Sequence, residues 1–168
     1  MSIQSRRQAR QRVLQLLFQL HFHPKVQDVQ INQWIDTLTF PPEGESVPED
    51  WQLGDYPDEA GLRISDQDRT FIREYVLYIH HHLADLDACY QPYLIGWDLA
   101  RLPIVDRCIL RLACYEITQR ADIPFSVSIN EAIILTHLFG SDRSRRYINA
   151  ILGKLEKVAC PKLDEVTN

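Results

Sequence analysis

The segment from Pro103 to Gln119 constrains the fold more than any other part of the chain, because it is the most apolar. Its residues leave little polar surface on any side of a helix: Ile104, Val105, Ile109, Leu110, Leu112, Ala113, Tyr115 and Ile117. A helix that is apolar almost all round is stable only when other elements cover it. Strand-like alternation of polar and apolar residues is not visible in the sequence. We therefore predict an all-α protein with this segment as its central, buried helix.

The spacing of apolar residues, together with the prolines and glycines, predicts the surrounding helices. They are expected at about residues 5–22, 26–38, 65–86, 128–139 and 141–158, with a further turn or short helix over 86–94. Ser128 and Glu131 have the S-x-x-E spacing of a capping box, so the helix that stops at Gly140 is expected to open there. A chain of 168 residues can bury one core or two small ones packed together.

The charged residues are unevenly distributed, so the formal net charge of −5 does not exclude a nucleic-acid ligand. Residues 1–27 contain no acidic side chain, whereas the proline-rich stretch 40–62 carries most of the acidic excess and is expected to be a long loop. This acidic loop has two open interpretations: a solvated excursion, or an arm that binds a partner or competes with RNA for the arginines. Because salt screens charges over about 8 Å, a local basic patch can bind phosphate.

The first predicted helix carries an aromatic residue on its polar side. At about 100° per residue, one face gathers the apolar positions Ala9, Val13, Leu16, Leu17 and Leu20. Phe18 points away from that face, nearly in line with Arg7, and Arg10 lies between them. Arginines bind phosphates and an exposed ring stacks on bases, so the pattern is typical of an RNA-binding helix. The alternative is that Phe18 packs under another helix and the arginines only add solubility.

A second basic and aromatic cluster stands at the start of the last predicted helix. It comprises Arg143, Arg145, Arg146 and Tyr147, and it follows directly on Phe139 and Gly140. Free N–H groups at a helix start add to the attraction for phosphate. A solvated helix end is the alternative. Two such clusters in one small protein favour a shared RNA-binding surface.

The sequence offers no support for a metal site, a cofactor, catalysis or a membrane span. His80, His81 and His82 diverge by about 100° per residue on a helix, so they cannot meet at one ion. Phosphate-binding, dinucleotide-binding, nucleophile-elbow and zinc-protease motifs are missing. Cys89, Cys108, Cys114 and Cys160 have no regular spacing and are expected to be reduced thiols. No apolar run approaches the roughly 20 residues needed to cross a bilayer, so a cytoplasmic protein is expected. Because the catalytic motifs are also missing, the protein is expected not to be an enzyme.

Several ordered segments together resemble the NusB family. They are Arg101–Ile117, Asp122–Pro124, Val127–Ala132, Phe139–Gly140 and Tyr147–Leu152, preceded by Arg6–Arg10 with Gln15 and Phe18. The resemblance implies two packed helical subdomains in a NusB-like bundle, here residues 1–95, with the acidic loop, and residues 96–168. The sequence departs from the family at three places. These are the acidic loop, Arg143, where some members carry an acidic residue, and Ala150, which replaces a common glycine.

The resemblance also implies a function in transcription antitermination. Such proteins bind the boxA element of ribosomal RNA leader transcripts together with the ribosomal protein NusE, within the antitermination complex of RNA polymerase. The RNA-binding residues carried over by position are Arg6, Arg7, Arg10, Phe18, Phe139 and Tyr147, to which the second cluster adds Arg143 and Arg146. Asp106 matches an acidic position that faces NusE.

Other interpretations of the sequence stay open beside this one. Family members also occur as homodimers, so a homodimer is a hypothesis here. A protein interaction module that does not bind RNA directly is the main alternative function. A fragment of an RNA methyltransferase with a NusB-like domain is disfavoured, because the chain ends soon after its last predicted helix.

Overall fold

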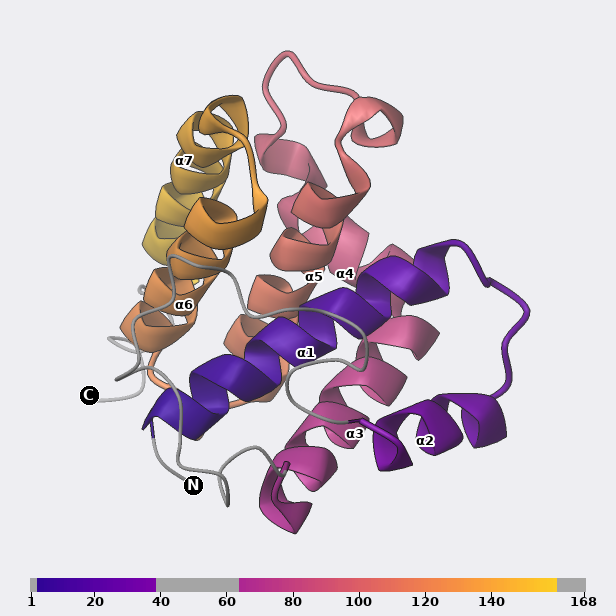
Figure 1. Ribbon diagram of the computed structural model, residues 1–168. Coiled ribbons are helices and arrows are strands. Elements are labelled where there is room, and N and C mark those ends of the chain that lie inside the picture. Colours follow the sequence, from indigo (N-terminus) through magenta and orange to yellow (C-terminus); the bar gives the residue numbers. More distant parts are fainter. Residues whose placement is uncertain (1–2, 39–63, 160–168) are drawn as a thin grey trace.

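The computed structural model describes residues 3–38 and 64–159, and Figure 1 shows the arrangement of the helices in this part of the chain. The all-α prediction is confirmed, since the described ranges contain helices and no strand. The acidic loop at 40–62 and Cys160 lie outside these ranges. In chain order the helices are α1 (Ile3–His21), α2 (Asp28–Asp36), α3 (Asp66–His81), α4 (Leu83–Tyr90), η3 (Gln91–Tyr93), η4 (Leu99–Arg101), α5 (Ile104–Gln119), α6 (Phe125–Phe139) and α7 (Asp142–Ala159).

The helix α5 is central and buried, as its composition predicts. It packs against α1, α3, α4, α6 and α7, and an unbroken run of its residues from Cys108 to Glu116 is buried. Even Arg111 and Glu116 within that run are covered, so their charges need partners inside the protein. Within the part of the chain that the structure describes, no helix has the length and apolar character needed to cross a membrane.

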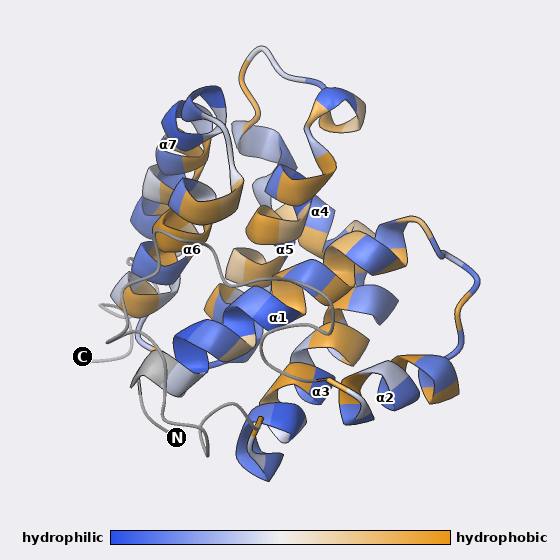
Figure 2. Cartoon of the chain, viewed as in Figure 1, coloured by the Kyte–Doolittle hydropathy of each residue, from blue (hydrophilic) through white to orange (hydrophobic). Residues whose placement is uncertain are grey.

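The helix α1 packs across both α3 and α5 with the apolar face that its periodicity predicts. Ala9, Val13, Leu16, Leu17 and Leu20 are all buried. In Figure 2 the orange, apolar sides of the helices turn toward one another, while the beginning of α1 is blue. One cluster of buried apolar residues extends from α1 to α7. The division into two subdomains near residue 95, in the segment between η3 and η4, therefore stays a prediction.

The structure corrects the prediction of one helix over residues 65–86, because the helix breaks at His82. The backbone N–H of His82 donates to the carbonyl of Ile79 at 3.2 Å, three residues back instead of four. The Nδ1 of its ring donates to the carbonyl oxygen of Tyr78 at 2.7 Å, and the rings of His82 and Tyr78 stack with centroids 4.0 Å apart. A side chain thus occupies the acceptor that would have continued the helix.

The structure also corrects the predicted capping box of Ser128 and Glu131. The helix α6 begins three residues earlier, at Phe125, and the N–H groups of Val127 and Ser128 both donate to the carbonyl of Pro124. Pro124 is the N-cap, and its extended ψ of 138° ends the preceding segment before the helix begins. Glu131 is consequently free to pair with another helix.

Candidate RNA-binding face

The arginines at the start of α1 fall into two environments. Arg6 is exposed, and the side chain of Arg7 keeps 33% of its surface exposed. Arg10, by contrast, is only 3% exposed. The prediction that Arg10 contacts RNA is therefore corrected, because its guanidinium lies in the interior and not at the surface.

A buried carboxylate on α5 holds Arg10 in the interior. The Nε of Arg10 donates to Oε1 of Glu116 at 2.7 Å, and the Tyr75 hydroxyl donates to the same oxygen at 2.8 Å. Burial and the nearby Glu116 raise the pKa of Tyr75, so its hydroxyl keeps its proton and remains a donor. The group of Arg10, Tyr75 and Glu116 joins α1, α3 and α5, and charged groups buried in this way depend on one another.

Arg7 joins α1 to the first half of α6. It donates to Glu131 from Nη2 at 2.9 Å and from Nε at 3.2 Å, and this bond raises the pKa of Arg7. A cavity of about 390 Å³ lies between the starts of the two helices, with Arg6, Arg7 and Asn130 among its lining residues. Arg7 is thus fixed on one side by an acid, and about a third of its side chain is open to solvent.

Phe18 is exposed, as its position on the helix predicts, with 42% of its surface accessible. Phe22 lies one helical turn further on and is 57% exposed. The two rings meet edge to face with centroids 5.3 Å apart. The interpretation that Phe18 packs under a neighbouring helix is wrong. The sequence analysis missed Phe22, although its spacing of four residues from Phe18 places it on the same side of the helix.

The corner between α6 and α7 presents the second cluster. Phe139 is 38% exposed, and Arg143 and Arg146 are exposed. Gly140 makes the corner tight, since a Cβ there would lie 2.8 Å from the carbonyl oxygen of Thr136. Ser141 caps α7, because its hydroxyl accepts the N–H of Ser144 at 3.1 Å. The tight turn at Gly140 and the Ser141 cap therefore fix the positions of Phe139 and the arginines.

Trp97 stands against this corner, although the sequence analysis gave it no role. The guanidinium carbon of Arg143 lies 4.3 Å from the Trp97 ring centroid, and the rings of Trp97 and Tyr147 are 5.0 Å apart. Gly96, at a φ of 75°, provides the left-handed turn that precedes Trp97. No periodic signal could have found this residue, because it reaches α7 from the irregular segment before η4.

Asp106 is fully buried, which corrects the prediction that it faces NusE. Its Oδ2 accepts the hydroxyl of Ser144 at 2.7 Å and also the hydroxyl of Tyr147. Its Oδ1 has no hydrogen-bond partner among the described residues. Burial raises the pKa of Asp106, and the Ser144 hydrogen bond offsets part of that rise. Asp106 therefore positions the start of α7, and its bond to Tyr147 leaves that ring half-buried.

The two clusters sit on helices that begin side by side and then diverge. Figure 1 shows α1 and α6 starting at the same edge of the molecule, with the corner to α7 at the far end of α6. The bonds of Arg7 to Glu131 fix this common edge. The arginine end of α1 is thus joined to α6, and Phe139 lies at the other end of that helix.

The three consecutive histidines point to different partners, as the helical geometry predicts. His81 contacts Asp28 at 2.9 Å, His82 stacks on Tyr78, and His80 lines a cavity beside α1. Among the residues that the structure describes, no group of three potential ligands could hold a metal ion.

Comparisons with known proteins agree with the resemblance seen in the sequence. Residues 7–157 match the NusB family. The transcription antitermination protein NusB of Desulforamulus reducens is 38% identical over 150 residues, covering 89% of this chain and 88% of that protein. The Bacillus subtilis protein of that name is 32% identical over 153 residues, covering 90% and 94%. The structure of T. maritima NusB superposes with a TM-score of 0.67 at 29% identity and covers 90% of each chain. The chain therefore belongs to the NusB family of transcription antitermination proteins.

Proposed function

We propose that this chain is a non-enzymatic, cytoplasmic antitermination factor that binds boxA-type leader RNA together with ribosomal protein NusE. In this role it joins the antitermination complex of RNA polymerase and supports transcription of ribosomal RNA operons. The observation that carries the proposal is the exposed side of α1, where Arg6 and Arg7 are followed by the ring pair of Phe18 and Phe22. Cationic groups bind the phosphates of a single strand, and exposed rings stack on its bases.

The corner between α6 and α7 supplies the second part of the proposed RNA-binding face. Arg143, Arg146 and Phe139 are exposed there and repeat the chemistry of α1. Tyr147 contributes an edge of its ring, since its hydroxyl is engaged with Asp106. Asp106 has an indirect role in this proposal, since it holds the start of α7 in place through Ser144 and Tyr147.

Fluorescence anisotropy with labelled leader RNA, at two salt concentrations and with or without NusE, tests the proposal. We expect Arg7→Ala to lower the affinity and to reduce the salt dependence by about one counterion. We expect Phe18→Leu, which keeps an apolar side chain but removes the ring, to cost about 1–3 kcal/mol of binding free energy.

Arg73→Ala is the matched control for Arg7→Ala. The side chain of Arg73 is 34% exposed and pairs with Asp36, so it resembles Arg7 in exposure and in having an acidic partner, but it lies on α3. Wild-type affinity in both the Arg7 and the Phe18 variants, with the fold intact, would overturn the proposal. If NusE bound while RNA did not, the chain would be a protein interaction module instead.

A further inference from the structure

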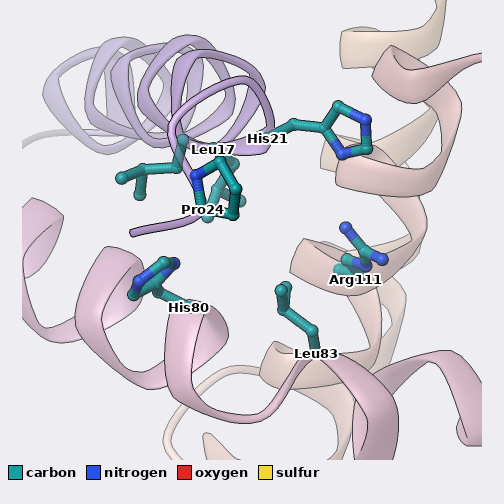
Figure 3. Close-up of a pocket in the computed structure, with 7 residues that line it drawn as sticks. Leu17, His21, Pro24, His80, Leu83 and Arg111 are labelled. Carbon is teal, nitrogen blue, oxygen red and sulfur yellow. The ribbon is translucent and has the colours of Figure 1, made fainter. Parts of the chain in front are cut away.

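A cavity of about 400 Å³ opens beside the last turn of α1, where α3 meets α4 (Figure 3). Leu17, Leu20, Pro24 and Leu83 provide apolar walls, and His21, His80 and Arg111 provide polar groups. Its size falls within the roughly 300–1,000 Å³ typical of pockets for small organic groups. None of these residues belongs to the proposed RNA-binding face.

The guanidinium of Arg111 is held in place by Asp87. Its Nε and Nη2 each donate to a different oxygen of Asp87 at 2.7 Å, and its side chain is only 9% exposed. A fork-to-fork pair of this kind holds the guanidinium plane in one orientation. Arg111 therefore presents a planar donor group of fixed orientation to the cavity.

The pKa values of both imidazoles of the cavity are lowered from their ordinary value, which favours the uncharged rings near neutral pH. Partial burial lowers the pKa of His21, and Arg107 and Arg111 lower it further. Burial and His81 lower the pKa of His80, with Asp28 acting in the opposite direction. A neutral imidazole has one donor and one acceptor nitrogen. The cavity thus combines apolar walls with mixed hydrogen-bonding groups, which suits a flat, uncharged ring better than a phosphate or a carboxylate.

The cavity continues the aromatic side of α1. His21 lines the cavity and also meets Phe22 edge to face at 5.3 Å, and Phe22 meets Phe18 at the same distance. A single strand that stacked on Phe18 and Phe22 would therefore meet His21 next. The unstacked bases of single-stranded RNA are commonly splayed out and bound by aromatic, imidazole and guanidinium groups.

We propose that this cavity binds one unstacked nucleobase of the RNA strand that runs along α1. The inference rests on the proposed function, since it assigns a further contact to the same RNA. The base would lie between the leucine walls, with its polar edge toward His21, His80 and the Arg111 guanidinium. The cavity would thereby add a binding position beyond the end of the exposed ring pair.

Filling the cavity is the direct test. Leu83 is 36% exposed at the start of α4 and points into the cavity (Figure 3), so Leu83→Trp adds bulk there without disturbing the core. We expect Leu83→Trp to raise the Kd for labelled leader RNA about tenfold, within the range for loss of one stacked base. His21→Ala should raise it less. The controls are Val29→Trp, at an exposed position of α2, and His23→Ala, because neither residue lines the cavity.

The outcomes separate this inference from the proposed function. If wild-type protein binds RNA, Phe18→Leu weakens binding and both cavity variants bind normally, the RNA-binding face stands and the nucleobase site is wrong. If the cavity variants weaken NusE binding but not RNA binding, a protein partner occupies the cavity and the nucleobase site is again wrong. If wild-type protein binds no leader RNA, both proposals fail. Circular dichroism and thermal melts of Leu83→Trp exclude misfolding as the cause of a loss.

Discussion

The start of α1 and the corner between α6 and α7 carry similar residues but are built in different ways. At the start of α1, carboxylates from other helices select which arginines reach the surface: Glu116 holds Arg10 inside, and Glu131 restrains Arg7. At the corner, Arg143 lies over Trp97 and Arg146 is exposed. The comparison shows that an arginine's role depends on the acids that surround it in space, which its spacing in the sequence does not reveal.

The largest effect that we expect concerns the stability contributed by the two α1 arginines. Arg10→Ala leaves Glu116 buried without its cation, and we expect it to lower the free energy of unfolding by about 3–5 kcal/mol. Arg7→Ala should cost about 1 kcal/mol or less, since Arg7 is partly exposed and Arg10 remains 4.0 Å from Glu131. Urea denaturation of both variants measures the difference. Equal losses would show that the two arginines are not distinct in environment.

A smaller effect is expected at the corner, where Gly140 allows a close approach to the Thr136 carbonyl. Gly140→Ala would bring a Cβ within 2.8 Å of the Thr136 carbonyl, and we expect a loss of about 1–3 kcal/mol. Gly153→Ala is the control, because nothing lies within 4 Å of its added Cβ. In the middle of α7 it should raise stability by about 0.5–1 kcal/mol. Thermal unfolding that shifted equally in both variants would contradict a tight corner.

The smallest effect concerns the pH dependence of stability. The free energy of unfolding should change with pH in opposite directions for substitutions in the two regions. Burial raises the pKa of Asp106 above 3.8. The protonated side chain therefore adds to the free energy of unfolding below pH 3.8, and this contribution is lost as the pH rises through the raised pKa. Asp106→Asn removes this loss. The unfolding free energy of the variant, relative to wild type, should therefore rise with pH above 3.8.

Asp122, near the start of α1, provides the contrast. The hydrogen bond from Arg120 lowers the pKa of Asp122 to about 2, so its contribution is present above 3.8 and lost as pH falls through 2. Relative to wild type, Asp122→Asn should lose stability as pH rises from about 2 to 3.8. Urea denaturation across pH 2–7 measures both differences. The same sign in the two variants would contradict these environments.

Much of the fold could be predicted from the sequence, because apolar periodicity reports directly on burial. The central helix α5, the inner face of α1 and the end of α6 at Gly140 are all confirmed. The break at His82 could not be predicted in this way, because it depends on a ring bonding to a backbone carbonyl. The start of α6 was misplaced because Ser128 and Glu131 have the spacing of a cap, whereas Glu131 pairs with Arg7 and the Ser128 hydroxyl has no hydrogen-bond partner among the described residues.

The candidate site could be predicted in part. The exposure of Phe18, Phe139 and Arg143 agrees with the prediction from helix angles and clustering. The burial of Arg10 and Asp106 could not be foreseen, since each depends on a partner far along the chain. Trp97 carries no sequence signal, as it reaches the corner from an irregular segment.

The ion pair of Arg10 and Glu116 spans 106 positions of the chain, and that of Arg7 and Glu131 spans 124. During synthesis the ribosome releases α1 long before it makes either acid. While the first helix is being synthesised, Arg10 has no counterion with which it could be buried. The helix α1 therefore cannot take its final position until α5, which carries Glu116, has been made. Assembly of this protein should accordingly be a late and concerted event, in which the beginning of the chain is among the last parts to dock.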